Sequence, residues 1–379
     1  MPEPSRLHGL DTLRAIAILA VMLYHLTIFG EITIRVLPIT YFGWMGVDLF
    51  FVLSGFLIGQ QLLKPYLRGT SPSIADFYLR RAFRILPCYL AVLALYFLVP
   101  AWREFPVLPP LWKFLTFTMN FGFSFSSRSF SNAWSLCVEE HFYLLLPLLV
   151  VLLMRRPSTL KTITLLLLLI ASGIALRAYL IAHFPDDIWE KIYYPSWTRF
   201  DGLVFGVTLA LIRTFRPHWW QHAATRGHTL LLTGLACIAA VLYLFRNEDL
   251  GNNTGPAKWG VVLGFPLLAF GLTLITASAL TTNGLLARWR IPGTKAIATL
   301  AFTLYLTHKP VAHLVMVHVP SITHAKGPAS WLLYAVTCAA TALVLHLAIE
   351  RPFLRLRDRT SRRQSSTGLE RKMRTDPAL

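Results

Sequence analysis

The stretch LDTLRAIAILAVMLYHLTIF, residues 10–29, is long and apolar enough to cross a membrane as a helix. It contains Arg14 and, eleven positions later, His25. Eleven residues at about 100° each make close to three turns, so the two side chains share one helix face about 16 Å apart. Asp11 lies one turn before Arg14 and is placed to pair with it. The stretch therefore predicts a retained spanning helix with a cation near one membrane boundary and an imidazole near mid-depth.

The chain as a whole has the composition of a polytopic membrane protein. Of its 379 residues 55% are hydrophobic, the mean hydropathy is +0.54, and several apolar runs reach spanning length. A cleavable leader is not expected, because no short apolar region followed by a small-residue cleavage site begins the chain. The predicted fold is all-α, with about ten transmembrane helices near residues 10–30, 43–63, 84–100, 135–154, 159–179, 200–213, 229–245, 258–280, 296–318 and 329–349.

The net charge of +18 is explained by where the basic residues lie. With the N-terminus inside, most of the 36 Lys and Arg residues fall on the inner side, so the positive-inside rule predicts that both termini are cytoplasmic. Nucleic acid is therefore not an expected partner. Residues 1–354 are interpreted as the membrane domain, and residues 355–379 as a basic, disordered cytoplasmic tail that rests on anionic lipid.

The four cysteines have no CxxC spacing, so neither a disulfide framework nor a zinc site is expected. Other groupings of polar residues with the spacing of metal ligands are also lacking in the sequence. We therefore expect no metal site.

Ionisable residues inside the predicted spans are candidate functional groups, because their burial in a membrane is costly. Glu139 begins the fourth span and shares a helix face with Ser135 and Tyr143, at spacings of four residues, whereas Glu140 points elsewhere. Alternatively, the two glutamates are only negative charges at the N-terminal end of this helix and have no catalytic role. His25 and Arg14 also have simpler interpretations, a hydrogen bond to a neighbouring helix and a side chain that extends to the inner interface.

Further ionisable residues occupy three other spans. Asp48 lies early in the second span among glycines that let helices approach closely, and His308 lies in the ninth much as His25 lies in the first. Arg199 and Asp201 begin the sixth span, where an ion pair inside the protein is the simpler interpretation of both. For Asp48 the simpler interpretation is a residue that favours the helix start.

These residues form two expected layers with different chemistry. Arg14, Arg81 and Arg84 lie at the inner side, where guanidinium groups suit a phosphate-bearing cytosolic ligand. The carboxylates lie deeper beside the histidines, an arrangement that suits proton transfer. Together the layers indicate a donor that enters from the cytosol and an acceptor that is met deeper or outside.

Seven motifs in order, from Leu10 to about Phe353, resemble the acyltransferase-3 family of integral-membrane acyltransferases. They are LDTLRAIAILAVMLYH, GVDLFFVLSGFLI, FYLRRAFRILP, AWSLCVEEHFYLLLP, TRFDGLVFG, LYLTHKP and ERPF. The resemblance implies about ten spanning helices and transfer of acyl groups, often acetyl from acetyl-CoA, to hydroxyls of surface polysaccharide, peptidoglycan, lipid-linked sugars or secondary metabolites. Arg14 and His25 match the family's essential pair, Arg81 and Arg84 its RxxR motif, and Glu139 its acidic position in WSLxxE. The SGNH-type esterase domain that some members append is not expected here.

The sequence and the resemblance together predict an O-acyltransferase of the bacterial inner membrane that modifies a carbohydrate or glycolipid. Its co-substrate is acyl-CoA, with no bound cofactor, and Arg14, Arg81 and Arg84 hold the CoA phosphates. His25, tuned by Glu139 or Asp48, is the general base, or the nucleophile of an acyl-histidine intermediate. His308 orients the acceptor or stabilises the oxyanion.

Three alternatives stay open at this point. Ten helices with buried His, Asp and Glu also describe a proton-coupled transporter or flippase of lipid-linked sugar. An acceptor among cytosolic secondary metabolites is a second alternative, and a non-catalytic scaffold with the same fold is a third.

Overall fold

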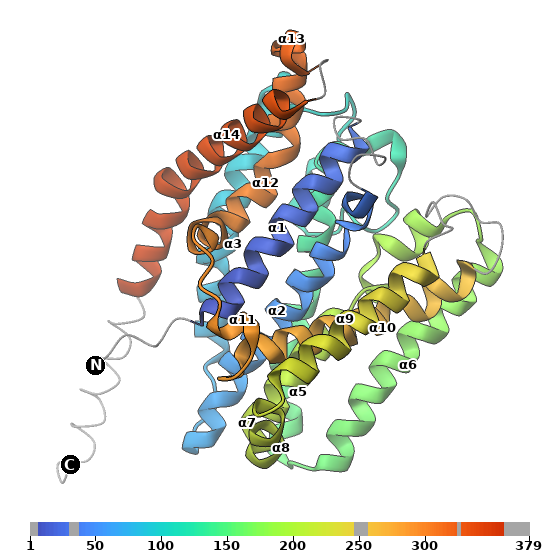
Figure 1. Cartoon of the computed structure of the whole chain (residues 1–379), viewed down its shortest axis with the longest axis vertical. Helices are drawn as coiled ribbons and strands as arrows, with labels where there is room; N and C mark the ends of the chain where they lie inside the picture. The colour runs from blue at the N-terminus through green and yellow to red at the C-terminus, as the bar shows by residue number, and fades with distance from the viewer. Residues whose placement is uncertain (1–6, 30–37, 246–256, 324–326, 360–379) are drawn as a thin grey trace. The chain divides into compact units, whose positions relative to one another are not determined.

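The computed structural model describes residues 7–29, 38–245, 257–323 and 327–359, and all regular structure in these ranges is helical (Figure 1). The predicted all-α fold is therefore confirmed. Among the described residues, eight helices are long and apolar enough to cross a membrane, so the chain is a polytopic membrane protein. They are His8–Ile28, Met45–Arg68, Ile74–Leu98, Ser131–Arg155, Thr159–His183, Gly227–Phe245, Gly260–Leu280 and Pro328–Arg359.

The two remaining predicted spans are helical but differ from these eight. Helix α7 (Asp201–Phe215) has only 15 residues. Helix α12 (Thr294–His318) has 25 residues but carries His308, Lys309 and Pro310 near its middle. Helix α7 is therefore too short to be one of the eight, and α12 is too polar along its length.

Helix α3 (Ile74–Leu98) begins ten residues before the predicted third span. The side chain of Ser73 accepts a hydrogen bond from the Asp76 N–H at 3.2 Å and so caps the N-terminus of the helix. Arg81, which precedes the predicted span, and Arg84, at its first residue, consequently both belong to the helix.

The chain divides into two compact units. The first unit comprises residues Met1–Ser71 and Glu104–Ala301, and the second comprises Pro72–Arg103 and Phe302–Leu379, with the boundary inside α12. The long helices of the first unit are α1 (His8–Ile28), α2 (Met45–Leu63), α5 (Trp134–Arg155), α6 (Thr159–His183), α7, α9 (Gly227–Phe245) and α10 (Ala257–Leu280).

Helix α2 is at the centre of the first unit, where it packs against α1, α5, α7 and α10. Its contact with α7 depends on glycine. A Cβ atom at Gly55 of α2 would collide with the Leu203 carbonyl oxygen, and one at Gly206 of α7 would collide with the Val52 carbonyl oxygen. Because neither residue has a Cβ, the two backbones touch, as small residues allow between membrane helices.

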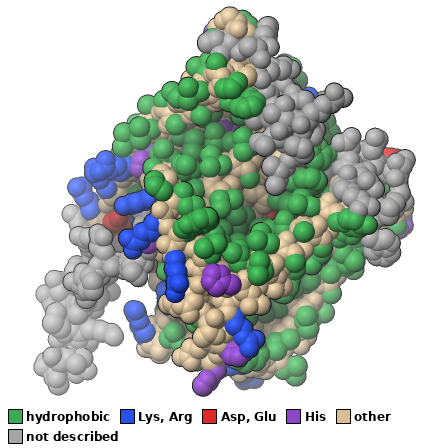
Figure 2. Space-filling model, in the orientation of Figure 1, with side chains coloured by type: hydrophobic (Ala, Val, Ile, Leu, Met, Phe, Trp, Pro, Cys, Tyr) green, Lys and Arg blue, Asp and Glu red, His purple; other side chains and the backbone are tan. Residues whose placement is uncertain are grey.

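Helix α6 is mostly exposed, in contrast to the mostly buried α2 and α10. Its exposed residues are apolar, with Leu167 and Leu168 each 61% exposed. Figure 2 shows hydrophobic side chains over much of the face in view. Apolar residues that face outward on a polytopic protein are suited to contact lipid chains.

The second unit is built from α3, the later part of α12, α13 (Pro320–Thr323) and α14 (Pro328–Leu345). After α14 the chain makes a π-helical turn, η8 (His346–Glu350), and stays helical to residue 359. The interpretation of residues 355–379 as a disordered tail is therefore wrong for residues 355–359. Residues 360–379 lie outside the described residues.

Candidate active site

Helix α1 carries the pair Arg14 and His25 within one continuous helix, as predicted. Arg14 is half-buried, and its Nη1 lies 3.8 Å from Asp11 Oδ1, which confirms the predicted pairing. His25 is also half-buried, and its ring meets that of Tyr24 edge to face at 5.4 Å between centroids.

The hydrogen bond of His25 selects its tautomer. Its Nδ1 lies 2.9 Å from the Val21 carbonyl oxygen. A carbonyl oxygen only accepts hydrogen bonds, so Nδ1 carries the hydrogen and the Nε2 of the neutral ring bears the lone pair. His308 on α12 and the exposed His183 on α6 make the same contact four residues back, so the bond follows from helix geometry and is not in itself a mark of catalysis.

Glu139 is held by hydroxyl groups from two helices. Ser54 of α2 donates to Oε1 at 2.9 Å, and Tyr143, one turn along α5, donates to Oε2 at 2.9 Å. The shared face predicted for Glu139 and Tyr143 is therefore confirmed, while Ser135 donates instead to the Asn132 carbonyl at 3.4 Å. The two hydrogen bonds fix the orientation of the Glu139 carboxylate.

Asp48 forms a buried ion pair that the sequence analysis did not identify. Arg199 Nη2 donates to both carboxylate oxygens of Asp48, at 2.9 and 3.0 Å. The guanidinium also lies over three rings, at 4.0 Å from the Phe265 centroid, 4.6 Å from that of Tyr193 and 5.4 Å from that of Trp134. The charge of Asp48 is thus compensated by Arg199, and the pair joins α2 to the residues that precede α7.

A second buried ion pair lies beside the first. Arg177 of α6 is fully buried and donates to the two oxygens of Asp201 at 2.7 and 3.1 Å, and to the carbonyls of Thr198 and Val262. Arg199 and Asp201 are therefore both paired, but with residues of other helices and not with each other. The sequence does contain a sign that Arg177 is paired, because this residue lies inside an apolar run, where an unpaired charge is unfavourable.

The second unit carries the remaining predicted site residues. Arg81 and Arg84 lie half-buried on α3, whereas Arg80 is exposed and pairs with Asp76 at 2.8 Å. His308 is 3% exposed on α12, and the Cys338 thiol of α14 donates to its backbone carbonyl at 3.9 Å. The same unit contains a pair that was not predicted, in which His346 Nδ1 lies 2.7 Å from Glu350 Oε2.

The first unit combines two groups suited to proton transfer. One is His25, whose Nε2 is the basic nitrogen, and the other is the Glu139 carboxylate, fixed by two hydroxyls. Within the described ranges, no three His, Cys, Asp or Glu side chains gather closely enough to hold a metal ion. In a polytopic helical protein, such groups are suited to acid–base chemistry within the membrane.

Comparison with known proteins identifies the family. The acyltransferase domain of the acyltransferase-3 family matches residues 7–349, so the chain belongs to this family of acyltransferases. The O-acetyltransferase OatA of Staphylococcus aureus is 26% identical over 383 residues, which cover 93% of this chain and 58% of OatA. YrhL of Bacillus subtilis is 29% identical over 91% of this chain and 54% of its own length. The peptidoglycan O-acetyltransferase OatA of Listeria monocytogenes is 29% identical over 55% of this chain and 34% of its own length.

The chain thus spans little more than half the length of OatA from Staphylococcus aureus and of YrhL, although each match covers most of this chain. No solved structure matches it. The comparisons therefore give a family and a chemistry, membrane acyl transfer, while the functional residues must be argued from this chain's own geometry.

Proposed function

We propose that the chain transfers an acyl group, in the first instance acetyl, from acyl-CoA to a hydroxyl of a carbohydrate or lipid-linked sugar in a bacterial plasma membrane. The observation that carries the proposal is the match of the acyltransferase domain to residues 7–349, within which helix α1 carries Arg14 and His25 together. The tautomer of His25 is compatible with the role of general base, because Nε2 bears the lone pair that this role needs. The names of the relatives, O-acetyltransferase and peptidoglycan O-acetyltransferase, support acetyl as the group and a glycan as the acceptor.

In the proposed reaction the acceptor hydroxyl attacks the thioester carbonyl. The hydroxyl proton passes to His25 Nε2, the C–O ester bond forms and the C–S bond breaks, and the same proton then passes to the departing CoA thiolate. Of the two candidate carboxylates, Glu139 is the better partner for this histidine, because the charge of Asp48 is already compensated by Arg199. We assign Asp48 a positioning role, in which it holds α2 against the start of α7.

The donor would be bound through its phosphates. Guanidinium groups form paired hydrogen bonds to phosphate oxygens, and the half-buried Arg14, Arg81 and Arg84 are the residues we propose for this role. His308, buried on α12, is proposed to orient the acceptor or to stabilise the oxyanion. We propose further that residues 1–354 form the transferase domain, that both termini are cytoplasmic and that the basic segment beyond the domain lies on anionic lipid.

The test uses purified protein in nanodiscs with acetyl-CoA labelled in the acetyl group. Wild type should release free CoA slowly, and His25→Ala should abolish the release. The matched control is His183→Ala, because His183 makes the same helical contact at 2.9 Å but is exposed on α6. Retention of full activity in His25→Ala would refute the role of His25. No thioester loss in wild type, even with membrane extracts as acceptors, would instead favour longer acyl donors or the proton-coupled carrier, which leaves acetyl-CoA intact.

A further inference from the structure

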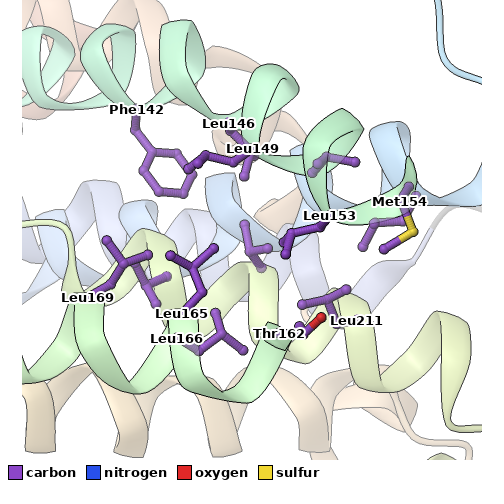
Figure 3. Close-up of a pocket in the computed structure, with 14 residues that line it drawn as sticks. Phe142, Leu146, Leu149, Leu153, Met154, Thr162, Leu165, Leu166, Leu169 and Leu211 are labelled. Atoms are coloured by element: carbon purple, nitrogen blue, oxygen red, sulfur yellow. The ribbon is translucent and has the colours of Figure 1, made fainter. Parts of the chain in front are cut away.

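An apolar groove runs between α5, α6 and α7 in the first unit (Figure 3). Phe142 and Leu149 of α5 lie across it from Leu165 and Leu169 of α6. Thr162 is the one residue with a polar side chain among the described residues that line this stretch. The stretch has only about 40 Å³ of open space, so it can take the end of a hydrocarbon chain that enters from a wider region, and it offers almost nothing to a polar ligand.

The groove widens at one end to a space of about 410 Å³, where polar side chains join a mostly apolar lining. The two stretches adjoin, because Met154 and Leu166 line both. Arg216 lies at the wide end and donates a hydrogen bond to the Thr159 hydroxyl at the start of α6. Trp219 is 63% exposed beside it, as is common for aromatic residues at a membrane interface.

The wide end is surrounded by basic residues. Arg155 ends α5, Arg156 follows it and Lys161 lies in the first turn of α6, all three exposed. Arg216 precedes α8 (Pro217–Ala224). The sequence has no Asp or Glu from residue 141 to 185 or from 202 to 247, the segments that contribute most of the lining. The apolar stretch thus leads to an end with basic residues nearby, in segments that contain no acidic residue.

We propose that this groove binds one anionic glycerophospholipid, with an acyl chain along the apolar stretch and the phosphate at Arg216. A guanidinium donates charge-assisted hydrogen bonds to phosphate oxygens, and the surrounding cations favour a headgroup with net negative charge. The lipid would support α5 from the side, next to the turn in which Tyr143 holds Glu139. The proposal does not depend on the identity of the acyl donor or acceptor.

Native mass spectrometry of the full chain, released from nanodiscs of phosphatidylcholine and phosphatidylglycerol, tests the proposal. Wild type should retain one phosphatidylglycerol in preference to phosphatidylcholine. Arg216→Gln should weaken this retention about tenfold, as expected for loss of a charged hydrogen bond, and Leu166→Trp should abolish it by filling the groove. The matched controls are Arg290→Gln, an exposed arginine of the first unit that belongs neither to the lining nor to the basic residues around the wide end, and Leu168→Trp, on the exposed side of α6, which should both retain the lipid.

Two results would overturn the proposal. Equal retention of both lipids, unchanged in Arg216→Gln, would show that the headgroup is not recognised by this arginine. Equal loss in Leu166→Trp and Leu168→Trp would show that the lipid binds the outer surface of α6 and not the groove. Because Arg216 is exposed, its variant remains informative even where Leu166→Trp fails to fold.

Discussion

Replacement of Asp48 by Asn should strongly destabilise the first unit, because it leaves the Arg199 guanidinium buried without its counter-ion. The two side chains are only 5% and 1% exposed, and their contact distance is 2.9 Å. Removal of one partner from a buried ion pair typically costs about 3–5 kcal/mol. The three aromatic rings around Arg199 offset part of this cost, since a desolvated cation–π contact contributes about 2 kcal/mol. We therefore expect a loss of about 1–3 kcal/mol in the free energy of unfolding.

The matched control is Asp76→Asn on α3, which removes an ion pair of similar length, 2.8 Å to Arg80. That pair is far more exposed, at 27% and 43% for the two side chains, so its loss should cost only about 0.2–1 kcal/mol. Both variants can be compared with wild type by equilibrium unfolding in mixed detergent micelles.

A double-mutant cycle separates the ion pair from other effects of substitution. Arg199→Met should also destabilise, while Asp48→Asn combined with Arg199→Met should cost clearly less than the two single changes added together, because no unpaired charge remains buried. Additive effects, or an Asp48→Asn variant no less stable than Asp76→Asn, would contradict the reasoning.

Three further predictions follow from single contacts. Tyr143→Phe removes the hydrogen bond from Tyr143 to Glu139 and should lower kcat/KM for acyl transfer about tenfold, with Glu139→Gln lower still; equal activity of Tyr143→Phe and wild type would refute the role of this bond. Gly206→Leu should prevent folding, because the new side chain would collide with the α2 backbone, and the measurement is loss of the monodisperse peak in size-exclusion chromatography. Gly173→Ala should be tolerated, because its Cβ atom would lie 3.5 Å from the nearest atom. Arg84→Gln should raise KM for acetyl-CoA with little change in kcat, and an unchanged KM in steady-state assays would exclude Arg84 from donor binding.

Much of the local structure was predictable from residue spacing. The helix that carries Arg14 and His25, the pairing of Arg14 with Asp11 and the shared face of Glu139 and Tyr143 all follow from the 3.6-residue period of a single helix. Length and hydropathy likewise predicted the helical membrane fold, because a spanning helix satisfies its own backbone hydrogen bonds whatever its neighbours are.

The partners of the buried charges were decided only by the tertiary structure. Asp48 and Arg199 are 151 residues apart, and Ser54 and Glu139 are 85 apart. Sequence spacing carries no information on such pairs, since they form where helix packing brings two faces together. The contact of α2 with α7 through Gly55 and Gly206 is the packing that places Asp48 beside Arg199. The sequence thus determined which polar residues enter the membrane, and packing determined which of them neutralise one another.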